Sequence, residues 1–249
     1  MARVWDRFLT EQDREHLANS KHRSVGVGRR PAVLNIDLYR AVFGDEKLPL
    51  VEGIKHWPSY CGPAAWEAVP HIQRLMKKAR EIGVPVLHVT GLSEEESGVP
   101  GWSDAIHPGA RKGVSSDPAA QARYARRLEI IDEVGPEPGE VVLKKTAPSA
   151  FWGTPLMAQL NLLHVDTLLI TGESVSGCVR ASVVEAASYR FKVQVVEECV
   201  FDRHESCRAI NLFDMNQKYA DVISIDAAMA YLEKLQGAAD VRQSELVKG

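Results

Sequence analysis

Two hydrophobic patterns alternate along the chain and predict the order of its elements. Short apolar runs have the length and composition of buried strands. Segments with apolar residues at helical spacing lie between and around them. The predicted strands are 32–36, 84–90, 140–144, 166–171, 192–198 and 221–225, and the predicted helices are 3–19, 64–82, 117–124, 154–162, 178–190, 205–218 and 226–236. This alternation indicates an α/β fold with three α/β/α layers and a central, mainly parallel, six-stranded sheet.

The 249 residues are most simply interpreted as one domain, 1–249. Residues 1–30 form a predicted N-terminal helix and connector, with Thr10 marking a cap or kink, and residues 237–249 are expected to fray. Two long segments rich in Gly and Pro, 44–63 and 93–113, interrupt the alternation. Because long irregular loops are uncommon in compact domains, we expect these segments to serve a site or an interface.

A cysteine lies at the junction between a predicted strand and the helix that follows it. The strand 166–171 ends at a small polar turn, and the next helix begins at Cys178. Ligands bind outside the carboxyl ends of strands in open α/β sheets, and a helix N-terminus lowers the pKa of a thiol. Cys178 is therefore a candidate nucleophile. The alternative is a small buried cysteine that packs the helix against the sheet.

Two further predicted strands end in charged residues. The first runs into Asp37, and another runs into Lys144 and Lys145. If the three strands lie side by side and parallel, a carboxylate, an ammonium and a thiol meet at one edge, which is the set that covalent amide hydrolysis requires. Each residue alone has a simpler explanation, because an Asp after a strand is commonly a cap and a Lys is commonly solvated.

These motifs resemble the isochorismatase-like cysteine hydrolases, which have a Rossmann-like fold. The resemblance is carried by AVLNIDLYRAVF around Asp37, KTAPSAFWGTPL from Lys145, and TGESVSGCVRAS around Cys178, and it spans about residues 28–227. The spacing of the second motif selects Lys145 over Lys144. The likeness is greatest to the members that hydrolyse small amides such as N-carbamoylsarcosine and maleamate and release ammonia.

The resemblance implies a mechanism and a set of site residues. Asp37 would accept the proton of Cys178, Lys145 would orient the carboxylate, and the backbone N–H groups of Val175 and Cys178 would hold the oxyanion. The bond Ser174–Val175 would be cis. Arg203 would pair with a substrate carboxylate, unless it pairs with Asp202 or Glu205 on the surface. The remaining expected pocket residues are Tyr39, Phe43, Trp152, Thr154 and Ser174, of which Phe43 and Trp152 could instead be core.

The chain departs from the family pattern at two positions, where Val175 replaces a usual Thr and Tyr39 replaces a usual Gln. These departures bear on the substrate more than on the chemistry. The expected substrate is a small amide, N-carbamoyl or ureido compound. The relatives also imply a homo-oligomer, a dimer or tetramer, in which the N-terminal helix and segment 44–63 cover neighbouring pockets.

Composition and charge limit the other possibilities. Thirty basic and 33 acidic residues give a net charge of −3 without a basic run, so neither nucleic acid nor an anionic membrane is indicated. No apolar stretch reaches the roughly 18 residues of a membrane helix, which favours a cytoplasmic protein. Four cysteines at no metal-type spacing favour a reducing compartment, and no metal or cofactor is expected.

Three functional classes remain open. The first is a hydrolase of C–N bonds, favoured by the complete set of Asp37, Lys145 and Cys178. The second is an isochorismatase-type vinyl ether hydrolase, against which Cys178 argues. The third is a binding member of the fold or a redox thiol protein, and the absence of a CxxC motif speaks against the redox version.

Overall fold

Six parallel strands form one sheet in the order β3-β2-β1-β4-β5-β6. The computed structural model describes residues 3–21, 23–98, 100–102 and 117–247. The strands are β1 (Pro31–Ile36), β2 (Val86–Gly91), β3 (Val141–Lys145), β4 (Thr167–Gly172), β5 (Lys192–Val200) and β6 (Asp221–Ile223). The predicted α/β fold with a parallel six-stranded sheet is confirmed.

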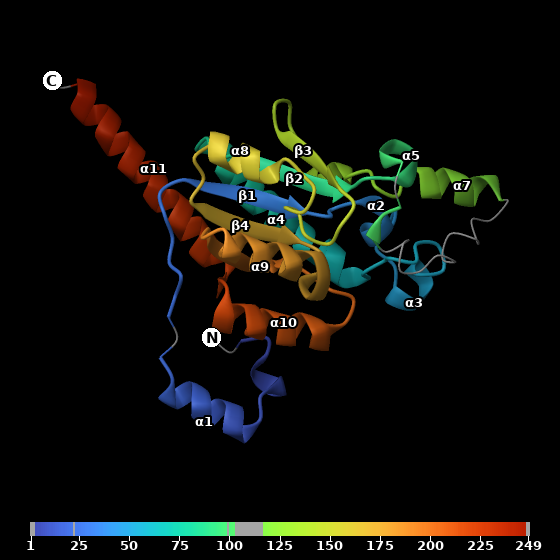
Figure 1. Cartoon of the computed structure of the whole chain (residues 1–249), viewed down its shortest axis with the longest axis horizontal. Coiled ribbons are helices and arrows are strands. Elements are labelled where there is room, and N and C mark those ends of the chain that lie inside the picture. The colour runs from blue at the N-terminus through green and yellow to red at the C-terminus, as the bar shows by residue number, and fades with distance from the viewer. Residues whose placement is uncertain (1–2, 22, 99, 103–116, 248–249) are drawn as a thin grey trace.

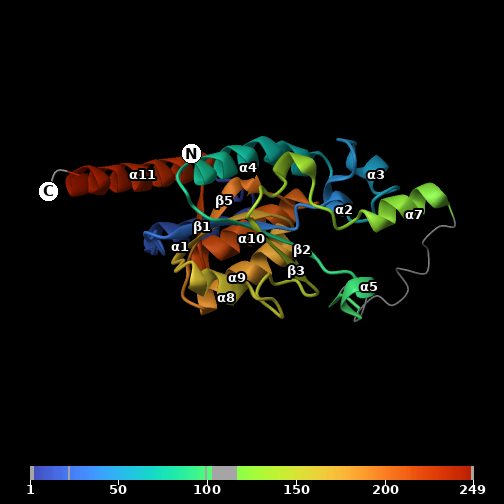
Figure 2. The same ribbon diagram turned by 90° about the horizontal axis from the view of Figure 1, so that it is seen from above.

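The helices cover both faces of this sheet, as Figures 1 and 2 show. The longer ones are α1 (Glu11–Asn19), α4 (Pro63–Glu81), α7 (Pro118–Ala125), α8 (Leu156–Leu162), α9 (Arg180–Ser188), α10 (Glu205–Lys218) and α11 (Ile225–Val247). Short helical segments are η1 (Asp6–Phe8), α2 (Arg40–Phe43), α3 (Leu50–Gly53), α5 (Glu94–Ser97), η2 (Asp132–Val134) and η3 (Val175–Val179). The last of these is a π-helical turn that leads into α9.

Two apolar cores lie on opposite faces of the sheet. One contains side chains of α8, α9 and α10, and the other contains side chains of α4 and α11. Helix α4 shows why the sequence builds these layers. Its buried residues recur at a spacing of three or four and so form one apolar face, comprising Ala65, Ala68, Val69, Ile72, Leu75, Met76 and Ala79. All residues of the central strand β1 are buried, which agrees with a run that is apolar except for Asn35.

The two ends of the chain differ from the prediction in detail. The N-terminal helix breaks into η1 and α1 at Thr10, whose side chain and that of Asp13 form a reciprocal capping box. Helix α1 buries none of its residues and lies apart from the sheet in Figure 1. At the other end, α11 continues to Val247, so the segment expected to fray from residue 237 is helical. The segment contains Ala, Gln, Glu and Leu, residues with high helix propensity.

The strand order corrects one premise of the site prediction. Strands β1 and β4 are neighbours, but β2 lies between β1 and β3. Lys145 at the end of β3 is therefore two strands away from Asp37, and only its long side chain brings the two charges together. Within the described part of the chain, no helix is long and apolar enough to cross a membrane.

Candidate active site

The carboxyl ends of four strands bring the polar groups of the site together. Asp37 directly follows β1, Lys145 is the last residue of β3, Glu173 directly follows β4, and Asp202 follows β5. These four ends lie on the same edge of the sheet, because all the strands run parallel. The site is thus assembled from segments that are more than 150 residues apart in the chain.

Asp37 is held in an unusual backbone conformation. Its N–H donates to Val89 O at 2.8 Å, which continues the ladder between β1 and β2. Its φ of 57° then turns the chain away from the sheet. The left-handed region is costly for a residue other than glycine and recurs at functional sites, where the surrounding structure enforces it. The side chain is completely buried.

Lys145 joins the carboxylate to the thiol. Its Nζ lies 2.8 Å from Asp37 Oδ2 and 3.3 Å from Cys178 Sγ, and it also donates to Ala147 O at 3.1 Å. Burial, the largest single influence, lowers the pKa of this ammonium, but the charges of Asp37 and Cys178 and the hydrogen bonds to both groups together outweigh burial, and the net pKa is raised. Lys145 is therefore a permanent cation. Apart from Lys145 and the Cys178 thiol, no described group donates to the Asp37 carboxylate.

The turn from β4 to Cys178 depends on two glycines. At Gly172, φ is 107°, and a Cβ would lie 1.9 Å from Ile36 O, so only glycine fits against β1. At Gly177, a Cβ would lie 2.5 Å from Ser174 Oγ. Ser174 O accepts hydrogen bonds from the N–H groups of Gly177 and Val179, both at 3.0 Å, and this pattern makes the π-helical turn.

The cis bond in this turn is Glu173–Ser174, so the prediction of Ser174–Val175 was wrong by one residue. The helical turn already begins at Val175, and the linker between β4 and that turn therefore consists of Glu173 and Ser174 alone.

Cys178 has a raised pKa, contrary to the expectation of a depressed one. Burial is the main cause, the charge of Asp37 adds to it, and Lys145 opposes it. The expected effect of the helix N-terminus is outweighed because the thiol is partly buried against a carboxylate. The sulfur therefore carries its proton in the free protein, with Asp37 placed to receive it.

One of the two predicted oxyanion donors is already engaged. The N–H of Val175 donates to Phe201 O at 3.1 Å, because the loop after β5 packs against the start of η3, so the prediction for Val175 was wrong. The N–H of Ser174, by contrast, donates no hydrogen bond within the described residues. Ser174 O accepts hydrogen bonds from the N–H groups of Gly177 and Val179 but not from the N–H of Cys178.

Sequence reasoning missed a second group of side chains beside this set. Glu173 is buried, and the Cys61 thiol donates to its Oε2 at 3.7 Å. Burial and the negative charge of Asp37 raise the pKa of Glu173 to about 8. Burial raises the pKa of Tyr39, and the charges of Asp37 and Glu173 add to this rise, so the phenol lies near both carboxyl groups. Its place in the substrate pocket stays a prediction. The available signal for Glu173 was a charged residue in the turn directly before the nucleophile.

Arg203 is not paired with either of the surface carboxylates considered above. Asp202 accepts instead from the backbone N–H groups of Arg203 and Ser176, at 2.8 and 2.7 Å, and Glu205 pairs with Arg7. The Arg203 Nε donates to Tyr60 O at 3.1 Å. Its guanidinium forms no ion pair with any described residue, and its charge contributes to the pKa of both Glu173 and Cys61.

Of three other predicted pocket residues, Phe43 and Thr154 have different roles and Trp152 is exposed. Phe43 is completely buried, and its ring packs edge-on against Trp66 and Phe201. Trp152 is 63% exposed. The Thr154 hydroxyl donates to Ala150 O at 2.6 Å and accepts from the N–H of Leu156, so it caps the start of α8. Phe43 and Thr154 are therefore engaged elsewhere in the structure, while the pocket role of Trp152 stays a prediction. Ser174 remains in it through its backbone.

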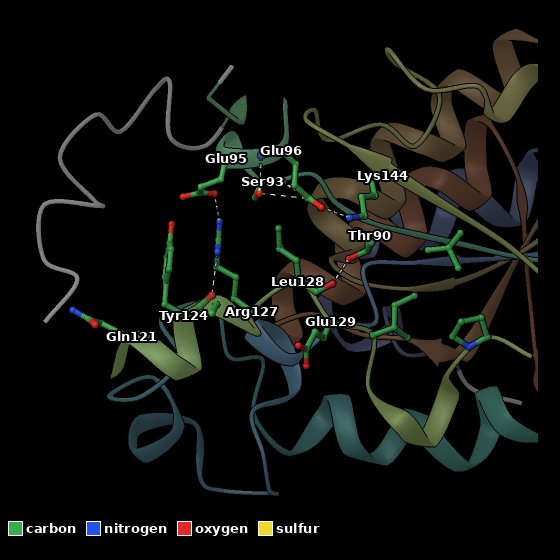
Figure 3. A pocket seen from close by; sticks show the side chains of 15 residues that line it. Thr90, Ser93, Glu95, Glu96, Gln121, Tyr124, Arg127, Leu128, Glu129 and Lys144 are labelled. Atoms are coloured by element: carbon green, nitrogen blue, oxygen red, sulfur yellow. Dashed lines mark hydrogen bonds and ion pairs between the residues drawn. The ribbon is translucent and has the colours of Figure 1, made fainter. Parts of the chain in front are cut away.

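One pocket lies beside this site rather than over it, since none of Asp37, Lys145 and Cys178 lines it. It measures about 830 Å³ and lies between β2, β3, α5 and α7. Figure 3 shows Arg127 between Tyr124 and Glu95, and Lys144 directed at Glu96. Adjacent strand residues point to opposite faces, so Lys144 lines this pocket while Lys145 reaches Asp37.

The comparisons with known proteins identify the family. The model of the isochorismatase domain matches residues 31–227. The chain belongs to the isochorismatase family. It is 34% identical to a maleamate amidohydrolase from Pseudomonas putida, over 86% of this chain and 92% of that protein. It is 33% identical to an N-carbamoylsarcosine amidase from Arthrobacter sp., over 86% of this chain and 75% of that protein.

Solved structures of other proteins share this architecture. An isochorismatase family protein from Desulfovibrio vulgaris has a TM-score of 0.65 at 28% identity, over 83% of this chain and 100% of that one. A cysteine hydrolase from Pseudomonas syringae has a TM-score of 0.69 at 16% identity, over 86% and 97%. The predicted enzyme class, a hydrolase of C–N bonds in linear amides, is confirmed by the amidohydrolase relatives.

No set of three or more His, Cys, Asp or Glu side chains within the described ranges is arranged to hold a metal ion.

Proposed function

We propose that this protein is a cysteine amidohydrolase that cleaves the C–N bond of a small amide, N-carbamoyl or ureido compound and releases ammonia. One observation supports this above all. A single ammonium, Lys145 Nζ, contacts both the Asp37 carboxylate and the Cys178 sulfur, at 2.8 and 3.3 Å. This arrangement puts a proton acceptor, a nucleophile and a fixed positive charge in direct contact.

The first half of the reaction transfers the acyl group to sulfur. Asp37 takes the proton of Cys178, and the thiolate attacks the carbonyl carbon of the amide. Lys145 stabilises both anions during this transfer, which offsets the cost of ionising a buried thiol. Asp37 then gives the same proton to the leaving nitrogen, the C–N bond breaks, and ammonia departs from a thioester on Cys178.

The backbone N–H groups of Ser174 and Cys178 are the proposed oxyanion donors. Ser174 replaces Val175 in this role, because the N–H of Val175 is engaged by Phe201 O while that of Ser174 has no acceptor among the described residues. Preorganised backbone donors of this kind commonly contribute about 3 kcal/mol each to transition-state stabilisation.

The second half releases the acid. A water loses its proton to Asp37 and attacks the thioester carbonyl, after which the C–S bond breaks. The proton on Asp37 returns to the sulfur, and the carboxylic acid leaves. The same aspartate therefore serves both halves, which requires a carboxylate close to the sulfur at all times.

The substrate class is proposed from the relatives and from Arg203. The relatives are named for maleamate, N-carbamoylsarcosine and ureidoacrylate. Arg203, whose guanidinium makes no ion pair with a described residue, is the proposed partner of a substrate carboxylate, and Tyr39 is a proposed wall of the pocket. We further propose a homo-oligomer that uses the exposed helix α1, and a reducing compartment for the four free cysteines.

Ammonia release by the purified protein tests the proposal. The substrates are N-carbamoyl amino acids, maleamate, nicotinamide, biuret and triuret, and Cys178→Ser is assayed alongside. We expect release from at least one compound, and a loss of at least about 10³-fold in kcat for the variant, since the hydroxyl is a far weaker nucleophile. Cys199→Ser is the matched control, since Cys199 is a free cysteine buried in the core on the α4 side of the sheet. The proposal would be refuted if no compound of the panel released ammonia, or if the activity survived in Cys178→Ser.

A further inference from the structure

Glu173 carries a carboxyl group that the proposed mechanism does not use. The residue directly follows β4, and its N–H donates to Ile36 O at 3.0 Å, which anchors it beside Asp37. Its side chain is only 9% exposed. Within the described residues, its one hydrogen bond comes from the Cys61 thiol at 3.7 Å, and a thiol is a weak donor. A buried carboxylate without a strong donor is poorly stabilised.

Charged groups at the ends of β1, β3 and β5 act on the ionisation of Glu173. Negative charge on Asp37 and Asp202 disfavours its ionisation, and the cations Lys145 and Arg203 oppose this effect. The other titratable groups that face it are Tyr39, Cys61 and Cys178. Burial is the largest influence, and the resulting pKa of about 8 leaves Glu173 protonated at neutral pH. A protonated carboxyl group has an O–H to donate.

The charges of the site leave one cation unmatched. Asp37 is paired with Lys145 at 2.8 Å, and Asp202 is satisfied by two backbone N–H groups. Arg203 is exposed and makes no ion pair with a described residue. Its Nε donates to Tyr60 O at 3.1 Å, and the thiol of the next residue, Cys61, contacts Glu173 at 3.7 Å. A substrate with one negative charge would balance Arg203, and it would do so beside a neutral acid that can donate a hydrogen bond.

We propose that the Glu173 carboxyl group donates a hydrogen bond to the carboxylate of the substrate while Arg203 pairs with that carboxylate. Glu173 then selects amides and N-carbamoyl compounds that bear a carboxylate, and it rejects them when it becomes an anion itself. This inference rests on the proposed amidohydrolase activity and names the chemical class of substrate for the same site.

Two matched substrates separate this role from general effects of pH. Maleamate carries a carboxylate, and maleamide is the same molecule with that group replaced by a neutral amide. For the wild-type protein, we expect KM for maleamate to rise about tenfold per pH unit above about pH 8, while KM for maleamide stays flat. In Glu173→Gln, the rise for maleamate disappears, because a glutamine amide donates at every pH.

The control variant is Glu81→Gln, which makes the same chemical change on the surface at the far end of α4. It should keep the alkaline rise in KM. A rise that persists in Glu173→Gln, an equal rise with maleamide, or hydrolysis confined to neutral compounds such as biuret would overturn the inference.

A binding experiment keeps the inference testable if Glu173→Gln does not fold. Maleamate is titrated by calorimetry into Cys178→Ser, which retains Glu173 and does not turn the ligand over. We expect Kd to rise about tenfold between about pH 8 and about pH 9. A constant Kd contradicts the role of Glu173. If ammonia release depends on Cys178 but neither KM nor Kd follows the ionisation of Glu173, only the inference fails. If release is absent or survives Cys178→Ser, the proposed function fails with it.

Discussion

Replacing Glu173 with glutamine should stabilise the protein at neutral pH. The pKa of Glu173 is raised from its usual value of 4.5 to about 8, chiefly by burial and then by the charge of Asp37. In the unfolded chain the carboxyl group ionises near pH 4.5, while in the folded protein it keeps its proton. A raised carboxyl pKa therefore costs stability, and the cost grows as pH rises from the lower value towards the higher one.

The magnitude follows from the pH interval. Between pH 4.5 and pH 7 the folded state holds a proton that the unfolded state has released, which at 1.36 kcal/mol per pH unit amounts to about 3 kcal/mol. Glutamine has nearly the shape of the neutral acid and does not titrate. We therefore expect Glu173→Gln to gain about 2–3 kcal/mol at pH 7 and to equal the wild type below about pH 4.

Urea unfolding at about pH 4, 5.5 and 7 measures this difference, with the protomer concentration held constant because assembly also adds stability. Glu81→Gln is the control, since an exposed carboxyl group should change stability by less than about 0.5 kcal/mol at each pH. A Glu173→Gln variant that is less stable than the wild type at pH 7, or whose gain is the same at pH 4 and pH 7, would refute the reasoning.

Two further predictions concern stability away from the reacting groups. Gly172→Ala should lower the free energy of unfolding by more than about 3 kcal/mol, because its Cβ would overlap a carbonyl oxygen of β1. Gly153→Ala has a positive φ but open space around its Cβ, so it should lower the free energy of unfolding by only about 1 kcal/mol. Thermal unfolding of both variants tests this difference, and equal losses would contradict the steric argument. Burial raises the pKa of Glu140, but hydrogen bonds from Arg80 and its neighbours outweigh burial and lower it to about 2. The wild type should therefore lose about 2 kcal/mol as pH falls from 4.5 towards 2, and a Glu140→Gln variant with an unchanged acid slope in urea unfolding would show that this pair does not contribute.

The order of elements could be predicted because it depends on local patterns. The apolar runs and the helical spacing each reflect which face of an element is buried, and this information is local in the chain. The motif around Asp37, Lys145 and Cys178 likewise placed three reactive groups at the ends of three strands. Their roles as acceptor, cation and nucleophile remain proposals, but their meeting at one edge is a feature of the structure.

Other features could not be predicted, because they depend on contacts between distant segments. The N–H of Val175 is engaged because the loop after β5 supplies the Phe201 carbonyl, and no pattern near Val175 indicates that contact. Phe43 is core rather than pocket because Trp66 and Phe201 pack around it. Glu173 meets the Cys61 thiol across 112 residues of chain.

The sequence by itself determined the strand and helix order, the family and the candidate nucleophile, since backbone preference and burial pattern act over a few residues. Only the tertiary structure decided that β2 separates β1 from β3, so that the length of the Lys145 side chain closes the gap to Asp37. The tertiary structure also decided that Cys178 and Glu173 keep their protons at neutral pH. The pKa of Cys178 and of Glu173 rises because folding removes both groups from water and brings them near Asp37, and burial and charge proximity exist only once distant strands are side by side.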